Sequence, residues 1–346
     1  MKQKNHFLKT IPLYRLAKIN LLLKVFAIAS ATVFFFAACV EDFDPASLLG
    51  DHIRVLSIRC DPPQAYPGDD VSIQSLIYVP EGSPGGLDTL WLVCRPSIGE
   101  SSQQCLAGVL SEVFGLSAGC DATCASDPDP ETCVELCLFE LFLDLSCDPL
   151  VNQKGCILGK SIQQTYSVPG DIRESLQAED SKKVFMFLMS TALAGGLPRC
   201  FEIFGEQAAQ TGGISPTEDC LMSLKELSVL DEGKEISRNP SVNGLLINGV
   251  VSEEFPGINI VEMEETEPKD NELTFEILFN TDEGVEAYIS WFSNCGKLKS
   301  GKTFADKNEN TLKPDRTGTC EIYAVVRDNA GGQNWIHRRL HLQPLN

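Results

Sequence analysis

The chain has 346 residues, 43% of them hydrophobic, and carries 48 acidic against 28 basic side chains, a formal net charge of −20 at pH 7. Such a charge repels nucleic acid and anionic lipid headgroups, so it argues against nucleic-acid binding. Behind an N-terminal signal, about 308 residues would remain, which is enough for two ordinary domains.

Residues 1–38 have the features of an export signal. A basic segment without acids, residues 1–24, leads into the uncharged run VFAIASATVFFFAA, which ends at Cys39. About fourteen apolar residues are too few for a helix to span the roughly 30 Å hydrocarbon core, which needs about twenty. The sequence therefore predicts a signal peptide that is cleaved. Its removal takes away six of the 28 basic residues and leaves 22 against 48 acids, a net charge near −26.

The residues Phe36-Ala37-Ala38-Cys39 resemble the lipobox of bacterial lipoproteins, in which the Cys is lipidated and becomes the new N-terminus. The resemblance implies that Cys39 carries palmitate and binds the protein to a membrane through this lipid. Val40, in place of Asp, implies the outer membrane, at its periplasmic face or the cell surface. The alternative is a general signal peptidase site that leaves Cys39 an ordinary thiol. Residues 39–50 are acidic and predict a tether.

Residues 51–232 are expected to form the first domain. Residues 71–79 alternate between apolar and polar side chains, the pattern of a half-buried strand, and follow a Pro67-Gly68 turn. Thr89 to Cys94 predict a strand that carries Trp91. This succession resembles the start of an immunoglobulin-like sandwich of the kind found at the front of Gram-negative surface lipoproteins.

Later parts of this domain predict two further strands and one helix. Strands are expected near residues 184–189 and about 224–230, with a loop around Cys200 between them. Ser215 as N-cap, Pro216 at the first helical position and Glu218 two residues further on form a capping box, which predicts a short helix. Residues from about 97 to 160 depart from the sandwich pattern and are interpreted as a cysteine-rich helical insertion.

Residues 238–346 are expected to form a second sandwich, behind the polar segment 231–240. Asn248-Gly249 between apolar runs predicts a type I′ hairpin. Alternating residues predict strands over 273–279 and 285–291. Residues 323–332, YAVVRDNAGG, resemble the closing hairpin of PKD-type and related bacterial immunoglobulin-like domains. The predicted fold is mainly β, with two immunoglobulin-like β-sandwiches, the first holding a disulfide-stapled helical insertion.

The sequence has 14 cysteines, and setting Cys39 aside leaves thirteen. In an exported protein these are expected to be oxidised, and the odd number leaves one unpaired, pairs one between molecules, or contradicts the lipid assignment. Cys295 and Cys320 are predicted to pair, because neighbouring antiparallel strands would bring them within the roughly 4.4 to 6.8 Å between Cα atoms that a disulfide needs. The pairing stays open for seven others: Cys60, Cys94, Cys105, Cys147, Cys156, Cys200 and Cys220.

The segment CDATCASDPDPETCVELC holds two Cys-x-x-x-Cys pairs on either side of a proline-containing spacer. On helices, residues four apart share a face, so two antiparallel helices would pair Cys120 with Cys137 and Cys124 with Cys133. This resembles the stapled helical hairpins of several unrelated small proteins. Zinc is the rival interpretation, but zinc ribbons use Cys-x-x-Cys turns and an oxidising compartment competes for the thiols. A redox site would also require Cys-x-x-Cys. We therefore expect a staple, with no metal and no cofactor.

The second of these helices is apolar on most sides. Phe139, Phe142 and Leu143 either pack on the sandwich or form a partner-binding patch. We favour burial, because exposed apolar patches of that size are uncommon on soluble proteins.

No catalytic motif stands out. His52, His337 and His341, the histidines after the signal, form no metal-binding pattern, and the sequence has no nucleophile elbow or phosphate-binding loop. The sequence therefore predicts a non-enzymatic binding or structural module with an unknown protein or glycan partner. The alternative is an accessory module or enzyme that acts on envelope glycans through carboxylates that no spacing singles out.

Overall fold

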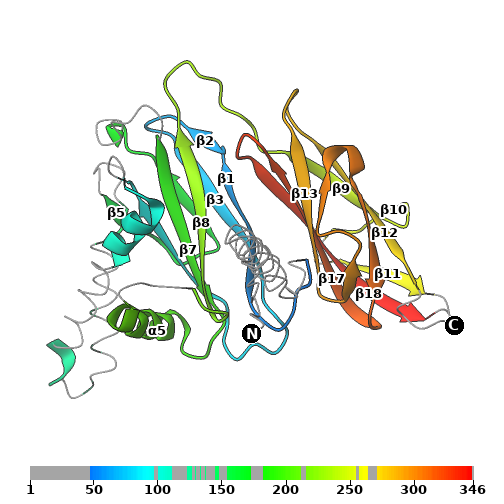
Figure 1. Cartoon of the computed structure of the whole chain (residues 1–346), viewed down its shortest axis with the longest axis horizontal. Coiled ribbons are helices and arrows are strands. Elements are labelled where there is room, and N and C mark those ends of the chain that lie inside the picture. Colours follow the sequence, from blue (N-terminus) through cyan, green and yellow to red (C-terminus); the bar gives the residue numbers. More distant parts are fainter. Residues whose placement is uncertain are drawn as a thin grey trace, which may run out of the picture. The chain divides into compact units, whose positions relative to one another are not determined.

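The structure is a computed structural model, shown in Figure 1. It describes residues 47–96, 100–110, 123–126, 129, 133, 137, 145–147, 154–172, 182–211, 216–254, 257–263 and 271–344. The expected signal peptide and seven further residues named above lie outside this part of the chain: Cys39, Val40, Cys120, Phe139, Phe142, Leu143 and Ser215.

The first sandwich consists of two sheets, with strand orders β1-β3-β6 and β2-β8-β7-β4-β5. Its strands, blue to yellow-green in Figure 1, are β1 (Arg54–Asp61), β2 (Gln64–Ala65), β3 (Asp70–Tyr78), β4 (Asp88–Cys94), β5 (Gly155–Gly159), β6 (Gln163–Ser167), β7 (Lys183–Thr191) and β8 (Cys220–Val229). One core of buried side chains joins the two sheets, with Ile73 of β3 and Trp91 of β4 both fully buried in it.

The second sandwich also consists of two sheets, with strand orders β10-β9-β12-β16-β14 and β11-β18-β17-β13-β15. Its strands are β9 (Ser241–Ile247), β10 (Val250–Val251), β11 (Ile258–Met263), β12 (Leu273–Asn280), β13 (Ala287–Ser293), β14 (Gly296–Leu298), β15 (Lys302–Phe304), β16 (Glu309–Pro314), β17 (Gly318–Asp328) and β18 (Gln333–Pro344), with the 3-10 turn η2 (Ala305–Lys307) after β15. Its core contains Phe275 of β12 and Trp291 of β13.

Both sandwiches have the immunoglobulin-like strand order. The sheet order β9-β12-β16-β14 corresponds to strands A, B, E and D, and the order β18-β17-β13 to strands G, F and C. In the first sandwich β1-β3-β6 and β8-β7-β4 repeat this division, with no strand D among the residues that the structure describes. Each C strand carries a tryptophan with no exposed surface, Trp91 in β4 and Trp291 in β13. The predicted fold class is therefore confirmed.

Helices cover the outer face of the larger sheet in the first sandwich. The helix α5 (Gly196–Thr211) and the helical residues 102–110 form a second core with β4 and β7, in which Leu110 and Phe204 are buried. Eight of the nine residues of β7 are consequently buried, which explains its unbroken apolar sequence. In the part of the chain that the structure describes, no helix is both long and apolar enough to cross a membrane.

The strand predictions are confirmed, and two local predictions for the first domain are wrong. The residues expected to start a helix behind Ser215 instead lead directly into β8, whose ladder with β7 runs from Cys220 to Ser228. The expected loop around Cys200 is the helix α5. In both places tertiary packing on the sheet outweighs local preference. The expected insertion also ends earlier than predicted, since β5 belongs to the sheet.

The type I′ hairpin at Asn248-Gly249 is confirmed. Both residues have positive φ angles, 50° and 79°, and they connect β9 to β10. The end of the segment expected to be a tether is part of the folded body. The backbone N–H of Leu49 donates to the carbonyl of Ser293 over 2.8 Å, and that of Ser293 donates to Ser47 over 2.9 Å.

Hydrogen bonds connect the two sandwiches along β1 and the β17–β18 hairpin. The Ser57 hydroxyl donates to Gln333 over 2.7 Å, and the Arg59 guanidinium donates to Asn334 over 2.8 Å. The ammonium group of Lys225, a residue that is only 7% exposed, donates to the Gly331 carbonyl over 2.7 Å. Side chains of the first sandwich thus donate hydrogen bonds to the β17–β18 hairpin.

Cys60 is the one cysteine with a free thiol among those that the structure describes, and it is buried in the first core beside Met186. Burial raises the pKa of this thiol from its ordinary value of 9.0 to about 12. Above pH 9 the unfolded chain loses the thiol proton while the folded chain keeps it. Because the unfolded state then binds fewer protons, stability falls as pH rises through this window.

We therefore expect a Cys60→Ala variant to lose less stability than the wild type between pH 9 and pH 11. The difference in slope should reach about 1.4 kcal/mol per pH unit. Urea unfolding at several pH values measures it. The cavity left by alanine lowers stability by a constant amount and does not change the slope. Equal slopes for the two proteins would contradict a buried, protonated thiol.

Candidate functional site

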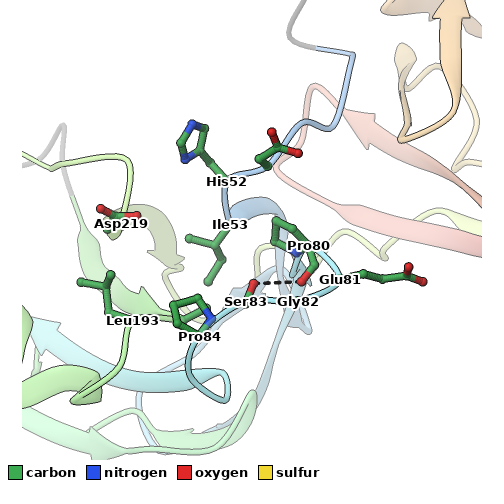
Figure 2. Close-up of a pocket in the computed structure, with 11 residues that line it drawn as sticks. His52, Ile53, Pro80, Glu81, Gly82, Ser83, Pro84, Leu193 and Asp219 are labelled. Atoms are coloured by element: carbon green, nitrogen blue, oxygen red, sulfur yellow. Dashed lines mark hydrogen bonds between the residues drawn. The ribbon is translucent and has the colours of Figure 1, made fainter.

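A pocket of about 260 Å³ lies at one end of the first sandwich, where three connecting segments meet. Figure 2 shows the lining residues, which come from the segment before β1, the β3–β4 loop and the two ends of the β7–β8 connection: Asp51, His52, Ile53, Pro80, Glu81, Gly82, Ser83, Pro84, Ala192, Leu193 and Asp219. The β3–β4 and β7–β8 segments correspond to the B–C and F–G loops, which form part of the recognition surface in variable immunoglobulin domains.

Backbone contacts fix the two principal loops against each other. The N–H of Gly85 donates to the carbonyl of Ala192 over 2.9 Å. A Cβ atom at Gly85 would lie 2.2 Å from the Leu193 carbonyl oxygen, so this approach requires glycine. Within the β3–β4 loop, the hydroxyl of Ser83 donates to the Pro80 carbonyl over 2.8 Å (Figure 2). These hydrogen bonds therefore hold the β3–β4 loop in one conformation beside the pocket.

The helix α5 is fixed at its start and in its second turn. The carboxylate of Asp88, at the beginning of β4, accepts a hydrogen bond from the Leu197 N–H over 3.0 Å, which satisfies one of the N-terminal donors of the helix. A disulfide joins Cys200 of the helix to Cys220 of β8, with 5.6 Å between the Cα atoms. The long β7–β8 connection is thus held on the sheet, and its two ends stay beside the β3–β4 loop.

The pocket is polar and mainly acidic. The acidic side chains of Asp51, Glu81 and Asp219 line it. His52 is the one histidine among the lining residues. The imidazole of His52 lies 3.3 Å from the carboxylate of Glu218, with both side chains largely exposed. Such a surface can accept hydrogen bonds from hydroxyl and amino groups of a ligand. The Ser83 hydroxyl bonds to a backbone carbonyl and not to His52, so it is not arranged as a nucleophile.

The structure places the predicted cysteine pairs as follows. Cys124 and Cys133 form a disulfide with 5.6 Å between Cα atoms, and Cys137 is also disulfide-bonded. Cys120 lies outside the described residues. Cys295, just before β14, and Cys320 in β17 form a disulfide with 5.4 Å between Cα atoms.

Three bridges were left open by the sequence. Besides Cys200–Cys220, these are Cys94–Cys105 and Cys147–Cys156. Each joins the large sheet of the first sandwich to a segment that covers it or runs beside it. The sequence separations are 20 residues for Cys200–Cys220, 11 for Cys94–Cys105 and 9 for Cys147–Cys156. They carry no signal of their own, because many other pairings would close loops of similar length.

A second polar group that sequence reasoning missed lies at the sandwich junction. The hydroxyl of Tyr323 donates to the carboxylate of Glu321 over 2.6 Å, and Arg339 donates to the same carboxylate over 3.2 Å. The ring of His337 stacks on that of Tyr323 with 4.2 Å between centroids. Burial acts to raise the pKa of Glu321, but the hydrogen bonds from His337 and Tyr323 and the nearby positive charge outweigh it and hold that pKa at about 2.

The side chains of this cluster pack between the two sandwiches, which indicates a structural role. Tyr323 contacts Tyr78 of the first sandwich edge to face, with 6.4 Å between ring centroids, and both rings are almost fully buried. Within the described residues, no three His, Cys, Asp or Glu side chains gather so that they could hold a metal ion. The loop end of the first sandwich therefore remains the candidate functional site.

No protein-family model matches the chain, and no curated protein matches it. Among solved structures, the fibronectin(III)-like modules of CbhA from Clostridium thermocellum align at 9% identity and a TM-score of 0.25, over 83% of this chain and 95% of that one. The D0–D1 domains of Intimin align at 8% identity and a TM-score of 0.21, over 83% and 98%.

A nucleoside hydrolase-related hypothetical protein from Saccharophagus degradans aligns at 11% identity and a TM-score of 0.23, over 32% of this chain and 26% of that one. The aligned part is thus about a quarter of that protein. Likenesses this distant carry no functional argument. The class of the protein, a mainly β chain with two immunoglobulin-like sandwiches, follows from its own strand order.

Proposed function

We propose that the protein is an extracytoplasmic lipoprotein, attached to the outer membrane through Cys39, that acts as a non-enzymatic binding module. Its ligand is a protein or glycan of the envelope or of its surroundings, and the loop end of the first sandwich recognises it. The observation that carries this proposal is the pocket between the β3–β4 loop and the two ends of the β7–β8 connection. Recognition sites concentrate on such loops when a rigid sandwich positions them.

Two features support the compartment. Disulfides are formed and kept in oxidising compartments, and the described residues contain five complete ones. The lipobox-like sequence before Cys39 supports attachment by lipid. The alternative function, an enzyme or accessory module acting on envelope glycans, has no observation among the described residues that favours it.

A charge-reversal experiment tests the proposed site. Glu81 and Asp219 are exposed and line the pocket, so the double variant Glu81→Arg, Asp219→Arg changes its charge without touching the core. We expect cross-linking in native envelopes, followed by purification, to recover at least about tenfold less of the bound species with this variant, because buried or complementary charge contacts contribute on the order of 1.4 kcal/mol or more. Protease treatment before capture separates a glycan ligand, which survives it, from a protein ligand.

The matched control is Glu283→Arg combined with Asp306→Arg. These are exposed acids on the second sandwich, so the control makes the same change in net charge away from the pocket. It should capture as much as the wild type. Equal losses in both double variants would indicate a general charge effect, and no loss in either would remove the loop end as the binding site.

A further inference from the structure

A second pocket, of about 380 Å³, lies on the solvent-facing side of the β14–β16 pair in the second sandwich. Its lining is Glu272, Lys297, Leu298, Lys299, Thr311 and Lys313. Leu298 and Leu312 point into the core, so the alternation of a strand places Lys297, Lys299 and Lys313 on the outer face. We name these three residues the lysine pocket.

The strand register places two of these lysines directly opposite each other. Lys297 of β14 pairs with Lys313 of β16 in the antiparallel ladder. The N–H of Lys299 donates to the Thr311 carbonyl over 2.8 Å, which places the third lysine at the next position on the same face. Like charges directly opposite on antiparallel strands are destabilising. The arrangement therefore has an electrostatic cost that a bound anion would relieve.

Among the described residues, one carboxylate lines this pocket. Glu272 lies 2.9 Å from the ammonium of Lys313. The hydrogen bond from Lys313, its charge and the charge of Lys299 lower the pKa of Glu272. Three lysines against one glutamate give the described lining residues a formal charge of +2, in a chain whose net charge is −20.

Protection of a sheet edge explains only two of these three lysines. The strand β14 is an edge strand, and lysines on edges discourage pairing with other chains. That explains Lys297 and Lys299. It does not explain Lys313, because β16 is an inner strand that pairs with β12 on one side and β14 on the other.

We propose that the lysine pocket binds a phosphate group. A lysine ammonium is a compact point charge that suits phosphate oxygens, and a phosphate monoester carries a charge of about −1.5 to −2 near neutral pH, which matches the surplus of the lining. The half-buried Thr311 adds a side-chain hydroxyl that can donate to a phosphate oxygen. The phosphate can come from a soluble phosphate ester or from a lipid headgroup, and the strongly negative chain favours the soluble source over an anionic membrane surface.

Equilibrium dialysis of the full chain against radiolabelled orthophosphate at low ionic strength tests this site. We expect one phosphate per chain in the wild type, and an affinity about tenfold lower in Lys297→Gln and in Lys313→Gln, because each removes a charged hydrogen-bond donor. The Glu272→Gln variant should bind severalfold more tightly, because the competing carboxylate is gone. Lys302→Gln is the matched control: this exposed lysine lies on β15, in the other sheet of the second sandwich and outside the pocket, over the ring of Tyr288.

Vesicles of phosphatidylcholine with and without phosphatidylglycerol distinguish the two sources. Binding to the phosphatidylglycerol vesicles that orthophosphate displaces, and that Lys297→Gln and Lys313→Gln lose, identifies a lipid headgroup. Binding of orthophosphate alone identifies a soluble phosphate. The proposal is overturned if the wild type binds neither, or if Lys302→Gln weakens phosphate binding as much as Lys297→Gln and Lys313→Gln do. All of these substitutions are on exposed side chains, so circular dichroism should show an unchanged fold.

Discussion

A Cys39→Ala variant is expected to incorporate no radiolabelled palmitate and to leave the membrane fraction. The expectation rests on the sequence Phe36-Ala37-Ala38-Cys39, in which the thiol of Cys39 is the atom that a lipid would modify. Without a lipid, attachment of the protein to a bilayer would lose the contribution of about 0.8 kcal/mol for each buried methylene of the acyl chains. Metabolic labelling followed by fractionation of the cells measures both effects in one experiment.

Cys60→Ala is the control for this experiment. Cys60 is a free thiol but is buried in the first sandwich, so its loss should leave labelling and fractionation unchanged. If Cys39→Ala still incorporated palmitate, the lipobox assignment would be wrong. In that case Cys39 would rejoin the other cysteines, and the number of thiols would be fourteen, which is even.

Strands such as β3, β12 and β13 could be predicted because one face of each lies in a core and the other is less buried. In β13 the residues Ala287, Ile289 and Trp291 are buried, while the side chains between them are only partly so, and this alternation is visible in the sequence. The hairpin at Asn248-Gly249 was equally visible, because its positive φ angles favour these two residue types. Local pattern and tertiary structure agree at these places.

The helix α5 and the disulfides of the first sandwich could not be predicted in the same way. The capping box at Ser215 is a local signal, but Cys220 and the residues behind it gain more from nine paired positions with β7 than from a short helix. The apolar run of β7 shows burial on both faces, yet it does not say which segments provide the cover. Only the packed structure shows that Cys200 belongs to the covering helix and that Cys220 belongs to the sheet.

The candidate site could not be predicted from the sequence either. His52, Ser83 and Asp219 lie in three separate connections, and no spacing along the chain relates them. They meet because β1 and β8 begin, and β3 ends, at the same end of the first sandwich. The lysine pocket is more local, since the segment GKLKSGK shows several lysines, but the position of Lys313 opposite Lys297 depends on the register between two strands. Register across a bulged or short pair is not fixed by the sequence pattern alone.

The largest expected loss of stability from a single substitution is that of Trp291→Ala. The side chain has no exposed surface, lies in the core between the two sheets of the second sandwich, and donates a hydrogen bond from Nε1 to the Thr303 hydroxyl over 2.8 Å. Replacing a buried tryptophan by alanine costs about 3–5 kcal/mol, because it removes apolar contacts and leaves a cavity. The Thr303 hydroxyl also loses a partner.

Urea unfolding followed by circular dichroism gives the change in the free energy of unfolding, and hydrogen exchange locates it in the second sandwich. Phe304→Ala is the matched control, since this aromatic side chain lies on the neighbouring strand β15 and is 60% exposed. It should cost less than about 1 kcal/mol, as surface substitutions usually do. A comparable loss in both variants would show that Trp291 is not the centre of this core. A large loss in Trp291→Ala alone would show that the second sandwich, like the first with Trp91, is built around the tryptophan of its C strand.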